Sequence, residues 1–190
     1  MDEFLNVSYT LSPLLVGLAF HGLCIKFGWL GWLARPIDAG ATLRGQPLLG
    51  ANKTYRGVLA VALGTAAGVS LQVLLHHIGV ARGAELLDYS NGAVIGLGFA
   101  IGAAAMLSEL PNSVLKRQLG VAPGAAGRGI VGLAFDVLDE VDMLLGVWVV
   151  LGLAVGVTVP RVLWSVLFLF ITHQVLTVVG YQLGMRATGR

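Results

Sequence analysis

The run GVLAVALGTAAGVSLQVLLHHIGV, residues 57–80, contains no Asp, Glu, Lys or Arg. A helix of this length can cross a hydrocarbon layer of about 30 Å, because each residue adds about 1.5 Å. Four further apolar runs of about 18 residues or more lie around it, at residues 11–33, 92–110, 143–159 and 162–183. We therefore expect an all-α, polytopic membrane protein with five transmembrane helices in one integral membrane domain over residues 1–190.

The composition agrees with this prediction and excludes an ordinary soluble domain. Hydrophobic residues make up 56% of the 190 residues, charged residues only 12%, and the mean hydropathy is +0.84. The first apolar run follows Asp2 and Glu3 rather than a basic start, so we expect it to be a retained span and not a cleaved signal peptide. The single cysteine, Cys24, excludes an intramolecular disulfide and a multi-thiolate metal site.

The basic residues are distributed unequally between the two sides of a five-span chain. Nine fall in segments on one side, two on the other, and Lys26 lies within the first span. Cytoplasmic loops carry an excess of Lys and Arg, so we expect the N-terminus outside, the C-terminus in the cytoplasm and two long cytoplasmic loops. The nine are Arg35, Arg44, Lys53, Arg56, Lys116, Arg117, Arg128, Arg186 and Arg190, and the two are Arg82 and Arg161.

The segments 34–56 and 111–142 differ from the other connections, because they are long, polar and rich in glycine. Function concentrates in such loops, whereas the remaining connections are short turns. The third span has glycines at small-xxx-small spacing, which predicts close approach of its neighbours. These glycines are Gly92, Gly96, Gly98 and Gly102.

The strongest chemical pattern is FDVLDEVDMLLG, residues 135–146, in which Asp136, Asp139 and Asp142 recur every three residues. If a helix begins at or before Asp136, these carboxylates lie along one side of it. Clustered acids repel one another unless a cation is present, and oxygen ligands suit a hard divalent ion such as Mg²⁺. The alternative is that the acids only favour the positive end of the helix dipole.

Two basic motifs accompany the acids. In NSVLKRQLG, residues 112–120, Ser113 lies one helical turn before Lys116 and Arg117, and Glu109 lies just upstream. A Lys-Arg pair can bind phosphate, or it can serve only as a topology signal. RPIDAGATLRGQPLLGANKTYRG, residues 35–57, has glycines beside basic residues, which suits a polyphosphate. Its polar residues include Arg35, Asp38, Arg44, Asn52, Lys53, Thr54 and Arg56.

Acids for a metal and cations for phosphates on one side of a membrane are the components of metal-assisted phosphoryl or nucleotidyl transfer. The alternative is a small ion- or solute-binding membrane protein that uses the three aspartates with His21 as a path. His21 and Lys26 are polar groups inside the first apolar run, and such residues are functional candidates. The near absence of polar residues in the second, third and fourth spans argues against a continuous path.

The ordered motifs resemble the CDP-archaeol synthase family, membrane CTP transferases related to the CDP-diacylglycerol synthases. The resemblance covers most of the chain, although Asp136 is additional and Glu109 stands where an Asp is expected. The Ala- and Gly-rich composition is more typical of a bacterial sequence than of an archaeal one. The matching segments are RPID at 35–38, LLGANKTYRG at 48–57, SVLKRQLG at 113–120, LDEVD at 138–142 and ITHQVLTVVGYQLG at 171–184.

The resemblance implies a magnesium-dependent cytidylyltransferase of the cell membrane, with its active site facing the cytoplasm. It would transfer CMP from CTP to a lipid phosphate, either ether-linked or diacyl, and release pyrophosphate; its partners would be these substrates and membrane lipids, not a nucleic acid. The resemblance implies catalytic roles for Lys116, Arg117, Asp139 and Asp142. It implies substrate binding by Asn52, Lys53, Thr54, Arg56 and Ser113, and metal binding by Asp139 and Asp142, to which we add Asp136 and Glu109 as candidates.

Overall fold

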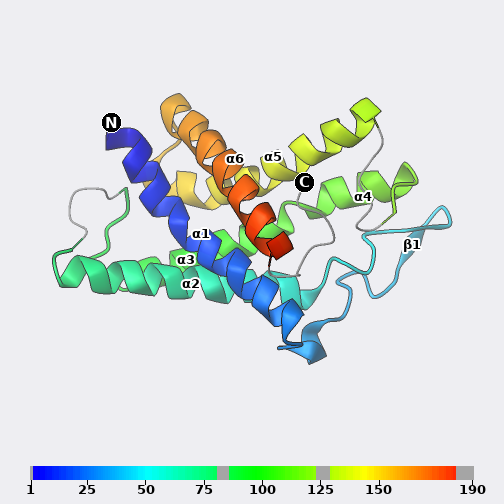
Figure 1. Cartoon of the computed structure of the whole chain (residues 1–190), viewed down its shortest axis with the longest axis horizontal. Helices are drawn as coiled ribbons and strands as arrows, with labels where there is room; N and C mark the ends of the chain where they lie inside the picture. The colour runs from blue at the N-terminus through cyan, green and yellow to red at the C-terminus, as the bar shows by residue number, and fades with distance from the viewer. Residues whose placement is uncertain (1, 81–85, 123–128, 183–190) are drawn as a thin grey trace.

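The protein, seen here as a computed structural model, consists of helices and one short β-ribbon, and the structure describes residues 2–80, 86–122 and 129–182 (Figure 1). The ribbon lies between the first two long helices, where the sequence predicts a polar loop. The helices are α1 (Asp2–Lys26), α2 (Tyr55–His77), α3 (Val94–Leu107), α4 (Leu110–Gln118), α5 (Gly129–Val155) and α6 (Val159–Gln182), with a 3-10 turn at Gly31–Leu33 and strands β1 (Thr42–Leu43) and β2 (Gln46–Pro47).

Close helix packing is achieved by small residues. A Cβ atom on Gly102 of α3 would lie 2.8 Å from the carbonyl oxygen of Val61 in α2, and one on Gly17 of α1 would lie 2.6 Å from the same oxygen. Such approach is typical of membrane helices, where dispersion contacts replace the hydrophobic effect as the packing force. Gly98 packs equally tightly against Val69. A Cβ atom on Gly92 or Gly96 would meet no described residue within 4 Å, so the predicted glycine face is half confirmed.

The predicted bounds of the first span, 11–33, are wrong at both ends. The helix begins at Asp2, because the polar residues of its first turns are partly buried against other helices; Gln72 of α2, for example, donates to the Tyr9 carbonyl at 2.6 Å. It ends at Lys26, because Gly28 and Leu30 adopt left-handed backbone angles that no helix continues through. Hydropathy alone registers neither effect.

The predicted long loop 111–142 is also largely helical. Pro111 lies in the first turn of α4, where its missing N–H costs no hydrogen bond, and α5 begins at Gly129. The predicted fourth span is therefore the second half of a longer helix. By length and composition α1, α2 and the stretch 94–118 can cross a membrane; the apolar parts of α5 and α6, Val141–Val155 and Val159–Thr172, are shorter. Five spans remain a prediction.

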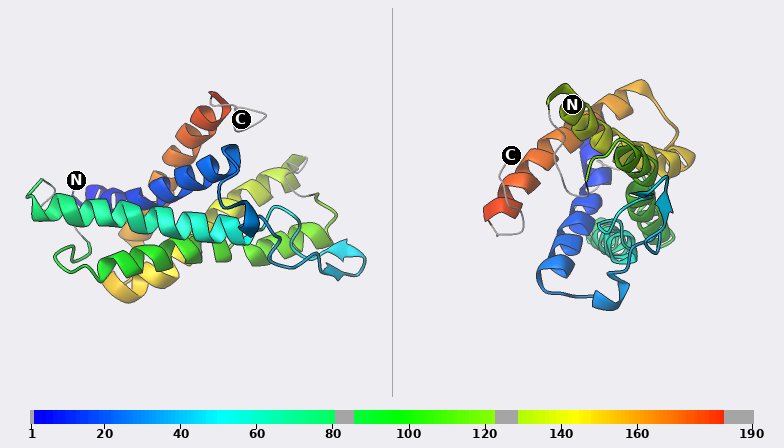
Figure 2. Two further views of the ribbon diagram at one scale, coloured as in Figure 1. Left: turned by 90° about the horizontal axis from the view of Figure 1, so that it is seen from below. Right: turned by 90° about the vertical axis from the view of Figure 1, so that its right-hand side faces the viewer.

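The helices alternate in direction, so the two polar segments meet at one end of the bundle (Figure 1). We call this the polar end: it holds the end of α1, the β-ribbon, the start of α2, α4 and the start of α5. The β-ribbon projects beyond the helices there (Figure 2). At the opposite end, Arg161 of α6 pairs with Glu3 of α1, with its Nε 2.9 Å from a carboxylate oxygen.

Candidate functional site

Asp38 organises the first polar segment. Its carboxylate accepts hydrogen bonds from the backbone N–H of Gly40 at 3.0 Å, of Leu49 at 2.8 Å and of Gly50 at 3.3 Å. Desolvation raises the pKa of Asp38, but the N–H groups of Leu49, Gly40 and Gly50 together outweigh it, so the pKa lies below its ordinary value. Asp38 therefore acts as an ionised clamp that folds residues 38–50 back on themselves.

The clamped segment leads directly into the start of α2. The Ile37 N–H donates to the Lys53 carbonyl at 2.9 Å, and the Tyr55 N–H donates to the Arg35 carbonyl at 3.2 Å. Thr54 is the N-cap of α2, because its Oγ1 accepts from the Gly57 N–H at 3.2 Å. The RPID and NKTYRG motifs are thus neighbours in space. Thr54, to which the resemblance assigns substrate binding, also begins the helix.

Lys53 connects this segment to the second one. Its Nζ forms an ion pair with Glu109, the residue just before α4, and both side chains are largely buried. The predicted phosphate ligand and the predicted metal ligand therefore neutralise each other in this structure. Burying either charge alone is costly, so the pair fixes the distance between the two polar segments.

Arg117 and its neighbours in α4 make internal contacts. The Arg117 side chain is only 4% exposed, its Nε donates to the Leu49 carbonyl at 3.1 Å, and its Nη1 donates to the Val121 carbonyl. Ser113 is equally buried and donates to the Glu109 carbonyl at 2.9 Å. Arg117 therefore holds the carbonyl of the peptide whose N–H is held by Asp38. Both residues, predicted as phosphate ligands, also support the fold of the site.

The remaining predicted substrate ligands differ in exposure. Asn52 is exposed in the loop before α2, and Lys116 is half-buried on α4. Arg56, in the first turn of α2, is half-buried, but its Nε is fully buried and hydrogen-bonds to no partner in the described part of the chain. A buried guanidinium nitrogen without a partner is unusual, because its desolvation is not repaid. Arg56 therefore has a buried donor that no described residue uses.

The three aspartates share one helix, as the sequence predicts, because α5 begins seven residues before Asp136. The Asp136 and Asp139 side chains lie outside the described residues. Asp142 is half-buried, and four residues later Gly146 packs directly against Ser108 at the end of α3. Since α5 and α3 run in opposite directions (Figure 1), Asp142 lies about one turn closer to the polar end than Gly146.

Among the side chains that the structure describes, no three His, Cys, Asp or Glu residues gather into a metal site. The donor set nevertheless suits a hard cation, because Asp142 supplies a partly buried carboxylate on a helix that also carries the other two aspartates. The magnesium prediction therefore depends on Asp136 and Asp139.

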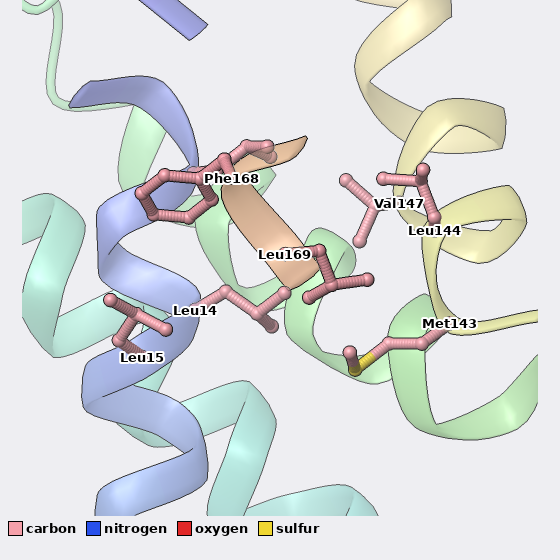
Figure 3. A pocket seen from close by; sticks show the side chains of 8 residues that line it. Leu14, Leu15, Met143, Leu144, Val147, Phe168 and Leu169 are labelled. Carbon is pink, nitrogen blue, oxygen red and sulfur yellow. The ribbon is translucent and has the colours of Figure 1, made fainter. Parts of the chain in front are cut away.

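A small apolar crevice lies away from the polar end, between α1, α5 and α6 (Figure 3). Leu14, Met143 and Leu169 are among its lining residues, and its volume of about 10 Å³ leaves room for no substrate. The lining side chains drawn in Figure 3 contain only carbon and sulfur. The crevice is therefore an imperfection of helix packing and not a second reaction site.

The motifs of the proposed transferase site do not include His21, which enters the sequence prediction only as a polar group in the first apolar run. In the structure its ring lies against Gly57, in the first turn of α2, beside the cationic residues. A glycine at the start of an apolar helix, following a basic loop, was the available signal, because it leaves space for a neighbouring ring. The clamp role of Asp38 had no such signal, since it depends on backbone groups eleven and twelve residues away.

Comparison with known proteins finds CDP-archaeol synthases. The CarS-like CDP-archaeol synthase family model matches residues 11–188. The CDP-archaeol synthase of Halorubrum lacusprofundi is 39% identical over 158 residues, which cover 80% of this chain and 82% of that protein. The CDP-archaeol synthase of Methanosarcina mazei is 28% identical over 169 residues, covering 80% of this chain and 88% of that protein. A bacterial source for this chain stays a prediction.

A solved structure of an intramembrane enzyme for archaeal membrane lipid biosynthesis has the same fold. It superposes with a TM-score of 0.64 over 90% of this chain and 91% of its own, at 22% identity. The protein is thus a membrane-embedded, multi-pass helical enzyme of the nucleotidyltransferase class, which decides against the ion- or solute-binding alternative. The chain belongs to the CDP-archaeol synthase family, as its motifs predict.

Proposed function

We propose that this protein transfers the cytidylyl group of CTP to a lipid phosphate and releases pyrophosphate, at the polar end of its helix bundle. The observation that carries the proposal is the Lys53–Glu109 pair, which joins the two motif-bearing segments of a CDP-archaeol synthase family member into one site. Cations for a triphosphate and acids for a metal then converge on one end of the molecule. Neither segment alone supplies both.

The polar end faces the cytoplasm in this proposal, with five spans, the N-terminus outside and the membrane being the cell membrane. The nine-to-two distribution of basic residues supports this orientation. The meeting of both polar segments at one end of the bundle supports it as well. CTP is a cytoplasmic nucleotide, so it reaches the site directly from solution, and the lipid enters laterally from the bilayer.

In the reaction, a non-bridging oxygen of the lipid phosphate attacks the α-phosphorus of CTP. The bond between that phosphorus and the oxygen bridging to the β-phosphate breaks, and pyrophosphate leaves in line. Lys53, Arg56 and Lys116 neutralise the phosphates, while Asp38 and Arg117 hold the loop that presents Lys53. The site therefore works through positioning and charge stabilisation, and no covalent enzyme intermediate is required.

Magnesium, when bound, would neutralise charge on the triphosphate and the leaving pyrophosphate. Asp139 and Asp142 would hold it, with Asp136 and Glu109 as further candidates. Glu109 can contribute only after it has separated from Lys53, because the two are paired in the structure. Binding of the triphosphate provides a physical reason for that separation, since its charge competes with Glu109 for the ammonium group.

The acceptor in this proposal is a glycerol phosphate lipid with ether-linked isoprenoid chains. The product in the names of both relatives supports this choice over a diacyl lipid. The head of the acceptor, a phosphate monoester, is the same in both lipid classes. Selection between them must therefore come from contacts with the chains and the backbone linkage.

The test uses purified protein in detergent with CTP, Mg²⁺ and a panel of ether-linked and diacyl glycerol phosphates. Pyrophosphate release is measured, and ATP, GTP and UTP serve as controls. Release with CTP and an ether-linked lipid, abolished by chelating the metal, is the expected result. Release without any lipid, or equal release with all four nucleotides, would contradict the proposed reaction.

A further inference from the structure

His21 lies on α1, where this helix packs against the start of α2. Its side chain is half-buried, and a Cβ atom on Gly57 would lie 3.4 Å from its Nε2 and 3.5 Å from its Cε1. The absence of a side chain at Gly57 therefore creates the space that the imidazole ring occupies. An imidazole at this position adds hydrogen-bonding capacity beside the first turn of α2.

Arg56 provides the charge beside this ring. The positive charges of Arg56 and Lys53 both act on His21, and Arg56 acts on Cys24, one turn further along the same face of α1. Arg56 directly precedes Gly57, the residue against which the His21 ring lies. Its buried Nε has no hydrogen-bond partner in the described part of the chain.

The proposed reaction needs two anion subsites, because both substrates carry phosphate. Lys53 lies in the polar segment before α2, whereas His21 belongs to α1, whose Leu23 and Ile25 are exposed on the apolar surface. A phosphate attached to a membrane lipid approaches from that surface. Arg56 and the His21 ring beside it therefore form a pair of hydrogen-bond donors between the polar segment and this surface.

We propose that His21 and Arg56 bind the phosphate of the lipid acceptor. This subsite rests on the proposed function and assigns to the acceptor a place distinct from that of the CTP phosphates. Each side chain donates a hydrogen bond to a non-bridging oxygen, so a third oxygen stays free to attack the nucleotide. The ligand class is a phosphate monoester on a hydrophobic alcohol.

Steady-state kinetics of His21→Gln and His21→Asn test the subsite, with His77→Gln as the matched control at the opposite end of α2. We expect the KM for the ether-linked lipid phosphate to rise about tenfold or more, the loss of one charge-assisted hydrogen bond, while the KM for CTP stays within about twofold. An unchanged KM for the lipid, or an equal rise for CTP and lipid, would overturn the proposal.

Modification of the wild-type protein by diethyl pyrocarbonate gives a second measurement that needs neither a variant nor turnover. We expect the lipid phosphate to slow carbethoxylation of His21, and peptide mass spectrometry locates the modified residue. Neither the same lipid lacking its phosphate nor CTP alone should slow the reaction. Protection by CTP alone would overturn the subsite. If wild-type protein forms no CDP-lipid but the lipid phosphate still protects His21, the proposed function fails and the subsite stands.

Discussion

At the scale of single residues, the Lys53–Glu109 pair decides how the two polar segments meet. We expect Glu109→Gln to lower the free energy of unfolding by about 3 kcal/mol, because it leaves a largely buried ammonium group without its counter-charge. Thermal unfolding in detergent measures this loss. The exchange Lys53→Glu with Glu109→Lys should recover much of the stability but no cytidylyl transfer, because the lysine then projects from the wrong segment. A double variant that remains active would remove Lys53 from phosphate binding.

Of the three aspartates predicted to bind the metal, Asp142 is the one whose side chain the structure describes. Asp142→Asn should reduce magnesium-dependent turnover by about 100-fold or more, because an amide neither carries the charge nor binds a hard cation as a carboxylate does. The exposed carboxylate of Asp88, at the opposite end of the bundle, offers Asp88→Asn as the control. Full magnesium-dependent turnover by an Asp142→Asn variant that inserts normally would exclude Asp142 from the mechanism.

Ionisation of Asp38 makes the stability of the protein depend on pH in the acidic range. Its pKa is lower in the folded protein than in the unfolded chain, so its contribution to stability is complete above the unfolded value of about 4 and is lost as the pH falls through the folded value. We expect Asp38→Asn to be less stable than wild type at neutral pH and the difference to shrink below about pH 4. Melting temperatures across this range measure it. Parallel curves for the two proteins would show that Asp38 is not the ionised clamp.

At the scale of helices, glycine position determines packing. Gly102→Ala should destabilise the protein by about 1–3 kcal/mol, because the added Cβ would lie 2.7 Å from the Thr65 Oγ1 and 2.8 Å from a backbone oxygen. Gly96→Ala, in the same helix but with nothing within 4 Å of its Cβ, should be neutral or slightly stabilising. Unfolding in detergent compares the two variants. Equal effects would contradict the packing of α3 on α2.

The helices also show what sequence periodicity could and could not predict. Helical class, the membrane location and the shared helix of the three aspartates follow from hydropathy and spacing. The ends of α1 do not, because its polar start is buried by α2 and its end is set by left-handed residues in an apolar run. The motifs predict most of the residues that gather at the polar end. The internal contacts of Arg117 and Asp38 could not be predicted, because they depend on backbone groups that no residue pattern specifies.

At the scale of the whole molecule, the sequence predicts an odd number of spans between the β-ribbon and the turn after α5. The native Cys24 is buried, so single cysteines introduced at exposed positions can be labelled with little background. Thr42 in the ribbon and Val157 in the turn are both exposed and lie at opposite ends of the bundle. The two positions therefore report on the orientation and on the spans formed by α2, the α3–α4 stretch and α5.

We expect a membrane-impermeant maleimide added to intact cells to label Val157→Cys, and to label Thr42→Cys only after permeabilisation. A Cys24→Ser background removes the remaining native thiol. Labelling of Thr42→Cys alone would reverse the orientation and place the nucleotide site outside, where CTP is not supplied. Labelling of Thr42→Cys and Val157→Cys from outside would mean that an even number of segments crosses the membrane between these positions. The weakly apolar start of α5 would then be the segment to re-examine, because its three aspartates make it the most costly to insert.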